Sequence, residues 1–151
     1  MLLTELLSPD RVLIPLPAGD RHAAIAALTR RLAESAGAGY DEVLNAVLER
    51  ESVLSTGVGF GVAIPHARSA AVRDLTMVAG VTATPVPFDA IDGEPVRLFF
   101  LIVGPEASAG LHVKILSRIA RLVRRDSVRQ QLLEAATADA FYTVLLDAEA
   151  R

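Results

Sequence analysis

The sequence predicts an α/β fold: a single-domain layered sandwich, in which a mixed β-sheet is flanked by helices on both faces. Two apolar runs, at 76–84 and 96–103, have the composition of strands, and segments with helical periodicity precede and follow them. The second run, VRLFFLIV, is apolar at almost every position, which is typical of a strand covered on both faces. Interleaved strands and helices favour a layered α/β architecture. We expect residues 1–151 to form one domain.

The first elements are a short strand and a helix. The apolar run VLIPL at 12–16 is bordered by proline, which favours an edge strand. Asp20 is expected to cap a helix that ends at Gly37. The apolar residues of this helix recur at helical spacing: Ile25, Leu28 and Leu32.

A second helix is predicted after Asp41, which is its candidate N-cap. Its apolar face contains Val43, Leu44, Val47 and Leu48. A glycine-rich loop follows, and the apolar stretch at 62–64 predicts a brief strand just before Pro65.

The second half of the chain alternates strand and helix signals. The strands at 76–84 and 96–103 are separated by Asp92-Gly93, a strong turn signal. Helices are predicted at 111–126, 127–137 and close to 139–150.

Composition and charge exclude several classes of protein. Hydrophobic residues make up 52% and charged residues 22%, as in a compact folded protein. The net charge of −3 gives no overall attraction to nucleic acid, and the absence of cysteine excludes disulfides, thiolate metal sites and a cysteine nucleophile. No uncharged apolar run reaches the ~18 residues needed for membrane insertion, and the N-terminus does not have the pattern of a signal peptide. We expect a cytoplasmic protein.

The stretch STGVGFGVAIPHAR at 55–68 places three alternating glycines, Gly57, Gly59 and Gly61, ahead of a Pro-His pair. A dinucleotide-binding loop would need glycine at position 62, and a P-loop would need Gly-Lys-Ser/Thr, so both readings fail. Pro65 keeps the chain extended, which predicts that His66 lies at the carboxyl end of a strand, where open α/β sheets bind ligands. The alternative is a histidine that only hydrogen-bonds a loop carbonyl.

His112 is expected on the apolar stripe of its helix, with Ile115, Leu116, Ile119 and Val123. It falls in the first turn, where free N–H groups and the helix dipole favour an anion and disfavour a protonated ring. The alternative is a buried histidine with a purely structural role. His22, among alanines in another first turn, is expected to be structural or exposed.

The remaining chemistry is that of a histidine nucleophile. The chain has no G-x-S-x-G elbow for a hydrolytic triad, and two histidines without paired spacing make an incomplete metal site. Phosphoryl transfer needs mainly positioning and charge neutralisation, which loop amides, a second histidine and one arginine would supply. Arg50 is the candidate arginine; the alternative is a cation that only complements a helix C-terminus.

A basic stripe is predicted along the helix at 111–126, on the side away from its apolar face. It is either solvated surface or a docking face for an acidic protein partner. Nucleic acid is not expected there, because the stripe has no interleaved aromatic residues. The stripe consists of Lys114, Arg118, Arg121 and Arg125.

The stretch RESVLSTGVGFGVAIPHAR resembles the enzyme IIA components of the fructose–mannitol (type 2) and nitrogen-regulatory family of the bacterial phosphoenolpyruvate phosphotransferase system. The stretches at 92–105 and 111–123 resemble the family's later strand and second-histidine helix, and LLSPDRVLIPL resembles its start. The resemblance therefore covers nearly the whole chain, as one enzyme IIA type-2-like domain. It departs at Ala67, where the family usually has glycine.

The resemblance implies that His66 accepts a phosphoryl group from a phosphohistidine on an HPr-like carrier protein. It implies that His112 supports the phosphate and that Arg50 contacts the phosphate or the partner, with Gly57, Gly59, Gly61 and Pro65 shaping the loop. It implies no metal or organic cofactor, and the lack of a long apolar run predicts no direct membrane insertion.

Two functional branches follow from the resemblance. A sugar-transport component passes the phosphoryl group to an enzyme IIB partner, whereas a regulatory relative binds target proteins according to its phosphorylation state. The freestanding chain favours the regulatory branch. The competing class is a catalytically silent protein-binding module that retains the fold, for which Ala67 is the one sequence feature.

Overall fold

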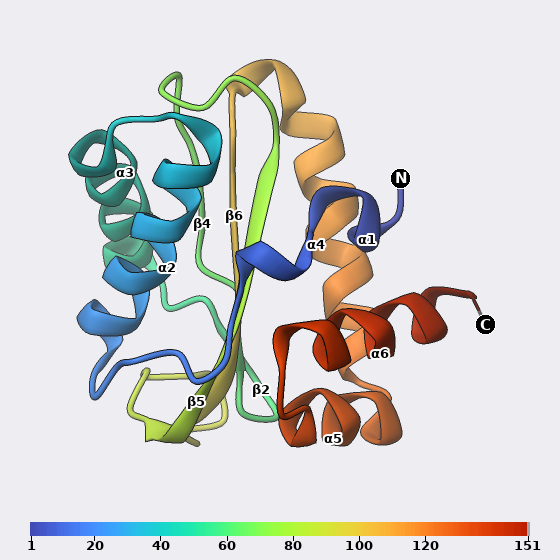
Figure 1. Ribbon diagram of the computed structural model, residues 1–151. Coiled ribbons are helices and arrows are strands. Elements are labelled where there is room, and N and C mark those ends of the chain that lie inside the picture. Colours follow the sequence, from blue (N-terminus) through green and yellow to red (C-terminus); the bar gives the residue numbers. More distant parts are fainter. Residues whose placement is uncertain (151) are drawn as a thin grey trace.

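The computed structural model describes residues 1–150 as a mixed six-stranded sheet between two helical layers (Figure 1). The strand order is β1-β5-β6-β3-β2, and β4 pairs with β6. Strands β5 (Thr76–Val86) and β6 (Val96–Gly104) form the long antiparallel centre, and β1 (Val12–Leu13) pairs in parallel with β5 at one edge. The predicted fold class, the edge strand and both long strands are confirmed.

At the other edge, the chain runs alongside β6 twice in the same direction. Strand β3 (Val62–Ala63) pairs in parallel with the start of β6, and β4 (His66–Arg68) pairs in parallel with its end. Pro65 lies between them, and its carbonyl accepts a hydrogen bond from Ile102 at 3.0 Å. The prediction that His66 ends a strand is therefore wrong: Pro65 interrupts the ladder, and pairing resumes at His66.

Helices α2 (Arg21–Ala36) and α3 (Tyr40–Val53) cover one face of the sheet. The Asp20 side chain accepts a hydrogen bond from the Ala23 amide, and Gly37 ends α2 in the left-handed conformation with φ 68°, as predicted. The prediction that Asp41 caps α3 is wrong, because the cap position is Gly39 and α3 begins at Tyr40. Asp41 lies in the first turn instead, where a carboxylate complements the helix dipole.

The opposite face is covered by four helices (Figure 1). They are α1 (Leu3–Leu6), α4 (Ala109–Val123), α5 (Asp126–Glu134) and α6 (Ala138–Ala150). Short 3-10 turns, η1 (Pro9–Arg11) and η2 (Glu106–Ser108), lead into β1 and α4. Two buried apolar clusters, one on each face, meet at β6, whose side chains alternate between them. The three C-terminal helices are confirmed; α1 and both 3-10 turns are too short to give a periodic signal.

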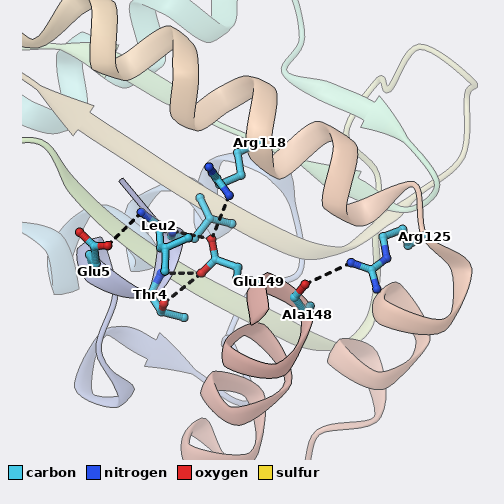
Figure 2. Close-up of polar contacts among 8 residues, drawn as sticks. Leu2, Thr4, Glu5, Arg118, Arg125, Ala148 and Glu149 are labelled. Atoms are coloured by element: carbon cyan, nitrogen blue, oxygen red, sulfur yellow. Dashed lines mark hydrogen bonds and ion pairs between the residues drawn. The ribbon is translucent and has the colours of Figure 1, made fainter. Parts of the chain in front are cut away.

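The two chain ends are held together by the carboxylate of Glu149 (Figure 2). It accepts hydrogen bonds from the amides of Leu3 and Thr4 at 2.7 and 3.0 Å and forms an ion pair with Arg118 at 3.8 Å, while its side chain is only 1% exposed. Arg125 donates to the Ala148 carbonyl at 3.2 Å. Two members of the predicted basic stripe thus bind α6 rather than forming free surface.

None of the helices within residues 1–150 combines the length and apolar character needed to cross a membrane.

Candidate functional site

A cavity of about 590 Å³ lies at the outer edge of β4, where a helix from each layer reaches the strand. Helix α3 approaches from one face and α4 from the other, and β4 forms the floor between them. The cavity brings together the three residues predicted to carry chemistry: His66, His112 and Arg50. Its lining is completed by Ala46, Glu49, Val53, Ala67, Arg68, Val113 and Leu116.

His66 opens β4, and its ring is held by the backbone just before it. Nδ1 lies 2.7 Å from the carbonyl oxygen of Ile64. A carbonyl oxygen can only accept, so Nδ1 carries the proton and Nε2 keeps its lone pair. Burial is the main cause that lowers the pKa of His66, and the nearby Arg50 and Arg68 charges lower it further against the opposing bond to Ile64. The ring is therefore neutral at pH 7, with Nε2 free to act as a nucleophile.

His112 faces His66 across the cavity, with the ring centroids 5.5 Å apart and the ring planes at 67°. It lies in the first turn of α4 and is only 3% exposed. Burial, then the neighbouring His66, lower the pKa of His112 to about 4, so its imidazole is neutral. Within residues 1–150, neither ring nitrogen has a hydrogen-bond partner. Leaving such a buried polar group unpaired costs about 1–3 kcal/mol, and a ligand bound in the cavity would satisfy it.

Arg50 lies in the last turn of α3. One of its Nη1 hydrogens is donated to the Leu54 carbonyl at 2.9 Å, just past the end of the helix. Arg50 therefore fulfils the helix-end role that the sequence left as an alternative and also lines the cavity beside both histidines.

The glycines do not line this cavity, which corrects the expectation that their loop amides surround a phosphate. They shape a tight hairpin between β2 (Gly57–Gly59) and β3. Gly59 and Gly61 have φ of 93° and 73°, and a Cβ on Gly57 would meet Ala90 at 2.7 Å. The hairpin thus acts on the site only by setting where β3, Pro65 and β4 begin.

Glu51, at the end of α3, is a buried acid that the sequence patterns do not reveal. Its carboxylate accepts from the amide of Thr56 at 2.9 Å and from the Thr56 hydroxyl. The Thr56 carbonyl accepts from the Ile64 amide at 3.0 Å, and the Ile64 carbonyl holds the ring of His66. A continuous chain of hydrogen bonds therefore links the end of α3 to the ring of His66. In the sequence, Glu51 follows Arg50 near the end of a predicted helix, where a charged residue is expected to be exposed. Only the fold shows that Glu51 is buried.

Two further residues considered in the sequence are His22, which lies outside the cavity, and Ala67, whose backbone is unstrained. His22 is exposed on α2, outside the cavity. Ala67 lies within β4 and is not among the described non-glycine residues with positive φ, which are Phe60 and Asp89. Alanine therefore fits this position without strain. No cluster of three metal-ligating side chains occurs in the described part of the chain.

Comparison with known proteins agrees with this geometry. Residues 5–148 match the family described as phosphoenolpyruvate-dependent sugar phosphotransferase system, EIIA 2. A nitrogen regulatory protein of Bradyrhizobium diazoefficiens is 34% identical over 145 residues, 96% of this chain and 95% of the relative. A fructose-specific EIIA component of Haloferax volcanii is 41% identical over 107 residues, 71% of this chain and 70% of the relative.

The fold has a similarly close counterpart among solved structures. The nitrogen regulatory protein IIA-Ntr from Neisseria meningitidis superposes with a TM-score of 0.89 at 31% identity, over 95% of this chain and 98% of that one. The sequence match and the fold agree over nearly the whole length of this chain. The chain therefore belongs to the EIIA 2 family of the phosphoenolpyruvate-dependent sugar phosphotransferase system and is a phosphotransferase component.

Proposed function

We propose that this chain is a phosphocarrier that accepts a phosphoryl group on Nε2 of His66 from the phosphohistidine of an HPr-like protein. The observation that carries the proposal is the pair of neutral imidazoles in one cavity. The His66 ring has its Nδ1 occupied by a carbonyl and its Nε2 unprotonated. The His112 ring is buried with its centroid 5.5 Å away, and neither of its nitrogens has a hydrogen-bond partner among the described residues.

The transfer step exchanges one P–N bond for another. The Nε2 lone pair of His66 forms the new bond to phosphorus, and the electron pair of the donor's P–N bond returns to the donor imidazole. The proton on Nδ1 of His66 stays in place, because its bond to the Ile64 carbonyl stabilises the positive charge that the ring gains. When the group passes to the next protein, the acceptor's nucleophile forms the new bond to phosphorus, and the electron pair of the P–N bond returns to Nε2 of His66.

The surrounding groups stabilise the phosphoryl oxygens rather than form bonds to phosphorus. Because the low pKa keeps His112 neutral, its ring donates one N–H to a phosphoryl oxygen. It adds no positive charge that would compete with Arg50 for the phosphoryl group. Arg50 supplies positive charge at the end of α3, where it is already oriented by Leu54. Positioning and charge neutralisation of this kind are the main demands of phosphoryl transfer.

We propose that the carrier belongs to the regulatory branch and changes its binding of a target protein when phosphorylated, in the cytoplasm. The extended similarity to two nitrogen regulatory proteins along nearly the whole chain supports this branch. Transfer to an enzyme IIB partner for sugar uptake is the second candidate, supported by the 41% identity to a fructose-specific component.

The test is incubation with phosphorylated carrier proteins of both the sugar and nitrogen branches, followed by detection of an acid-labile, base-stable adduct. We expect wild type to be labelled, His66→Ala to take up nothing, and His112→Ala to accept the group but pass it on poorly. Label that persists in His66→Ala contradicts the assignment. A wild type that no donor labels indicates the silent binding module instead.

The branch is tested with the phosphorylated protein itself. We expect little loss of label on addition of enzyme IIB domains, and a change in the set of captured partners between wild type and His66→Ala. Rapid discharge to a IIB domain identifies the sugar-transport branch.

A further inference from the structure

We propose that Arg68 is a second phosphate-binding arginine of this site, and that it exchanges its bond to Glu106 for the phosphoryl group when His66 is phosphorylated. The inference rests on the proposed phosphocarrier function and assigns a role to a residue that neither the motif nor the sequence analysis singled out.

The fold places Arg68 beside the acceptor. Successive side chains of a strand point to opposite faces, so Arg68 projects from β4 to the same side as His66, while Ala67 between them is buried. The side chains of Arg68 and His66 line the same cavity. The backbone of Arg68 is fixed in register opposite Gly104 of β6, so its direction does not depend on a flexible loop.

The electrostatics agree with this placement. The Arg68 charge contributes to lowering the pKa of His66 and of His112, so the guanidinium lies within electrostatic reach of both rings. The Arg50 charge contributes at His66. A phosphoryl group carries a charge close to −2, by analogy with other phosphorylated side chains. One arginine leaves such a charge half neutralised, and Arg50 with Arg68 balances it.

In the unphosphorylated protein Arg68 already has a partner. Its Nη1 donates to Oε1 of Glu106 at 3.1 Å, and the two side chains are 46% and 77% exposed. An ion pair this open to solvent is weak. A phosphoryl group carries more charge than a single carboxylate, and the guanidinium can bind two of its oxygens, so it outcompetes the exposed Glu106 carboxylate.

The exchange has a consequence at the surface. Glu106 begins η2, the turn that leads directly into the helix carrying His112. When Arg68 turns to the phosphoryl group, the exposed Glu106 carboxylate loses its cation. A protein that binds over Arg68 and Glu106 thus meets a different charge pattern in the two states.

The experiment measures the equilibrium of phosphoryl exchange with a phosphorylated HPr-like donor at pH 8, where both histidines are neutral. Purified full-length wild type, Arg68→Gln, Arg68→Lys, Glu106→Gln and the double variant are compared by the phosphohistidine signal in ³¹P NMR. The matched control is Arg124→Gln, which removes an exposed arginine just past the far end of α4. Circular dichroism checks that each variant is folded.

We expect Arg68→Gln to lower the equilibrium constant for phosphorylation about tenfold, as for loss of a hydrogen bond to a charged group. Arg68→Lys should fall between it and wild type. Glu106→Gln should raise the constant about twofold, because the competing ion pair is gone. The double variant should behave like Arg68→Gln alone, and Arg124→Gln like wild type.

Equal constants for Arg68→Gln and Arg124→Gln, with wild type normally phosphorylated, overturn this inference and leave the phosphocarrier function intact. A tenfold loss in Arg68→Gln with no change in Glu106→Gln overturns the exchange. A wild type that no donor phosphorylates contradicts the proposed function itself, and this inference with it.

Discussion

Replacing His112 by leucine should separate stability from function at this site. The change removes two buried ring nitrogens that have no partner among the described residues and leaves an apolar side chain of similar size on the buried stripe of α4. Replacing unsatisfied polar groups by apolar ones is nearly neutral or stabilising. We therefore expect His112→Leu to be at least as stable as wild type at pH 7.

The stability difference between His112→Leu and wild type grows when the pH is lowered. The folded pKa of His112 is about 4 and the unfolded value is 6.5, so below pH 6.5 the unfolded chain binds a proton that the folded chain refuses. Wild type therefore loses stability as the pH falls from 6.5 towards 4, and at pH 5 this linkage amounts to about 2 kcal/mol. His112→Leu lacks this loss.

The assay is urea unfolding of both proteins at pH 7 and pH 5, followed by circular dichroism. Comparing the two proteins cancels the carboxylates, which titrate in both. We expect the stability of His112→Leu relative to wild type to grow by about 2 kcal/mol between pH 7 and pH 5. A difference that stays constant, or a variant that is several kcal/mol less stable at pH 7, would refute the reasoning.

Three further substitutions test the support of the site. Gly57→Ala should cost about 1–3 kcal/mol in urea unfolding, because the new Cβ falls 2.8 Å from the Cα of Ala90; an unchanged midpoint contradicts the close approach. Ala67→Gly should leave the phosphorylation rate unchanged and cost about 1 kcal/mol of stability, since φ is ordinary there; faster transfer would show that alanine strains the loop. Glu149→Ala should cost about 2–4 kcal/mol by leaving two amides and Arg118 unpaired, seen as a Tm lower by roughly 5–12 °C; a Tm within ~2 °C of wild type contradicts the clamp.

Much of the fold follows from patterns that act over a few residues. The helical spacing of Ile25, Leu28 and Leu32, with Asp20 and Gly37 at the ends, is enough to bound α2 closely. The unbroken apolar run of β6 is enough to place it at the centre of the sheet. Such signals are local, because they express the period of one element and the chemistry of its ends.

The site depends on pairings that no local pattern reveals. β4 is only three residues long and begins directly after a proline, so no pattern in the sequence marks it as a strand of its own. It meets β6 through parallel pairing, and only that register brings His66 alongside the end of β6, from which η2 and α4 lead to His112. The Arg68–Glu106 pair joins residues 38 apart for the same reason. The sequence shows which residues have the chemistry for such a site. Tertiary pairing determines which of these residues face the same cavity.

The glycines illustrate an error with a physical cause. Alternating glycines before a histidine suggest amides turned towards a phosphate, yet here they satisfy a hairpin turn and a close approach to Ala90. A phosphate-binding loop and a tight hairpin both favour glycine, so the spacing of the glycines alone does not distinguish the two structures. The candidate anion-binding groups that line the cavity lie instead on the facing helices, with Arg50 and His112, and on β4, with Arg68.

The most direct test of the account is the position of the phosphoryl group on the imidazole. Wild type labelled with ¹⁵N at histidine is phosphorylated by its donor, and the ring nitrogens of His66 are followed by NMR. Because Nδ1 donates to the Ile64 carbonyl at 2.7 Å, we expect the P–N bond on Nε2, with Nδ1 still protonated. A bond to Nδ1, or phosphorylation of any other residue, would contradict it.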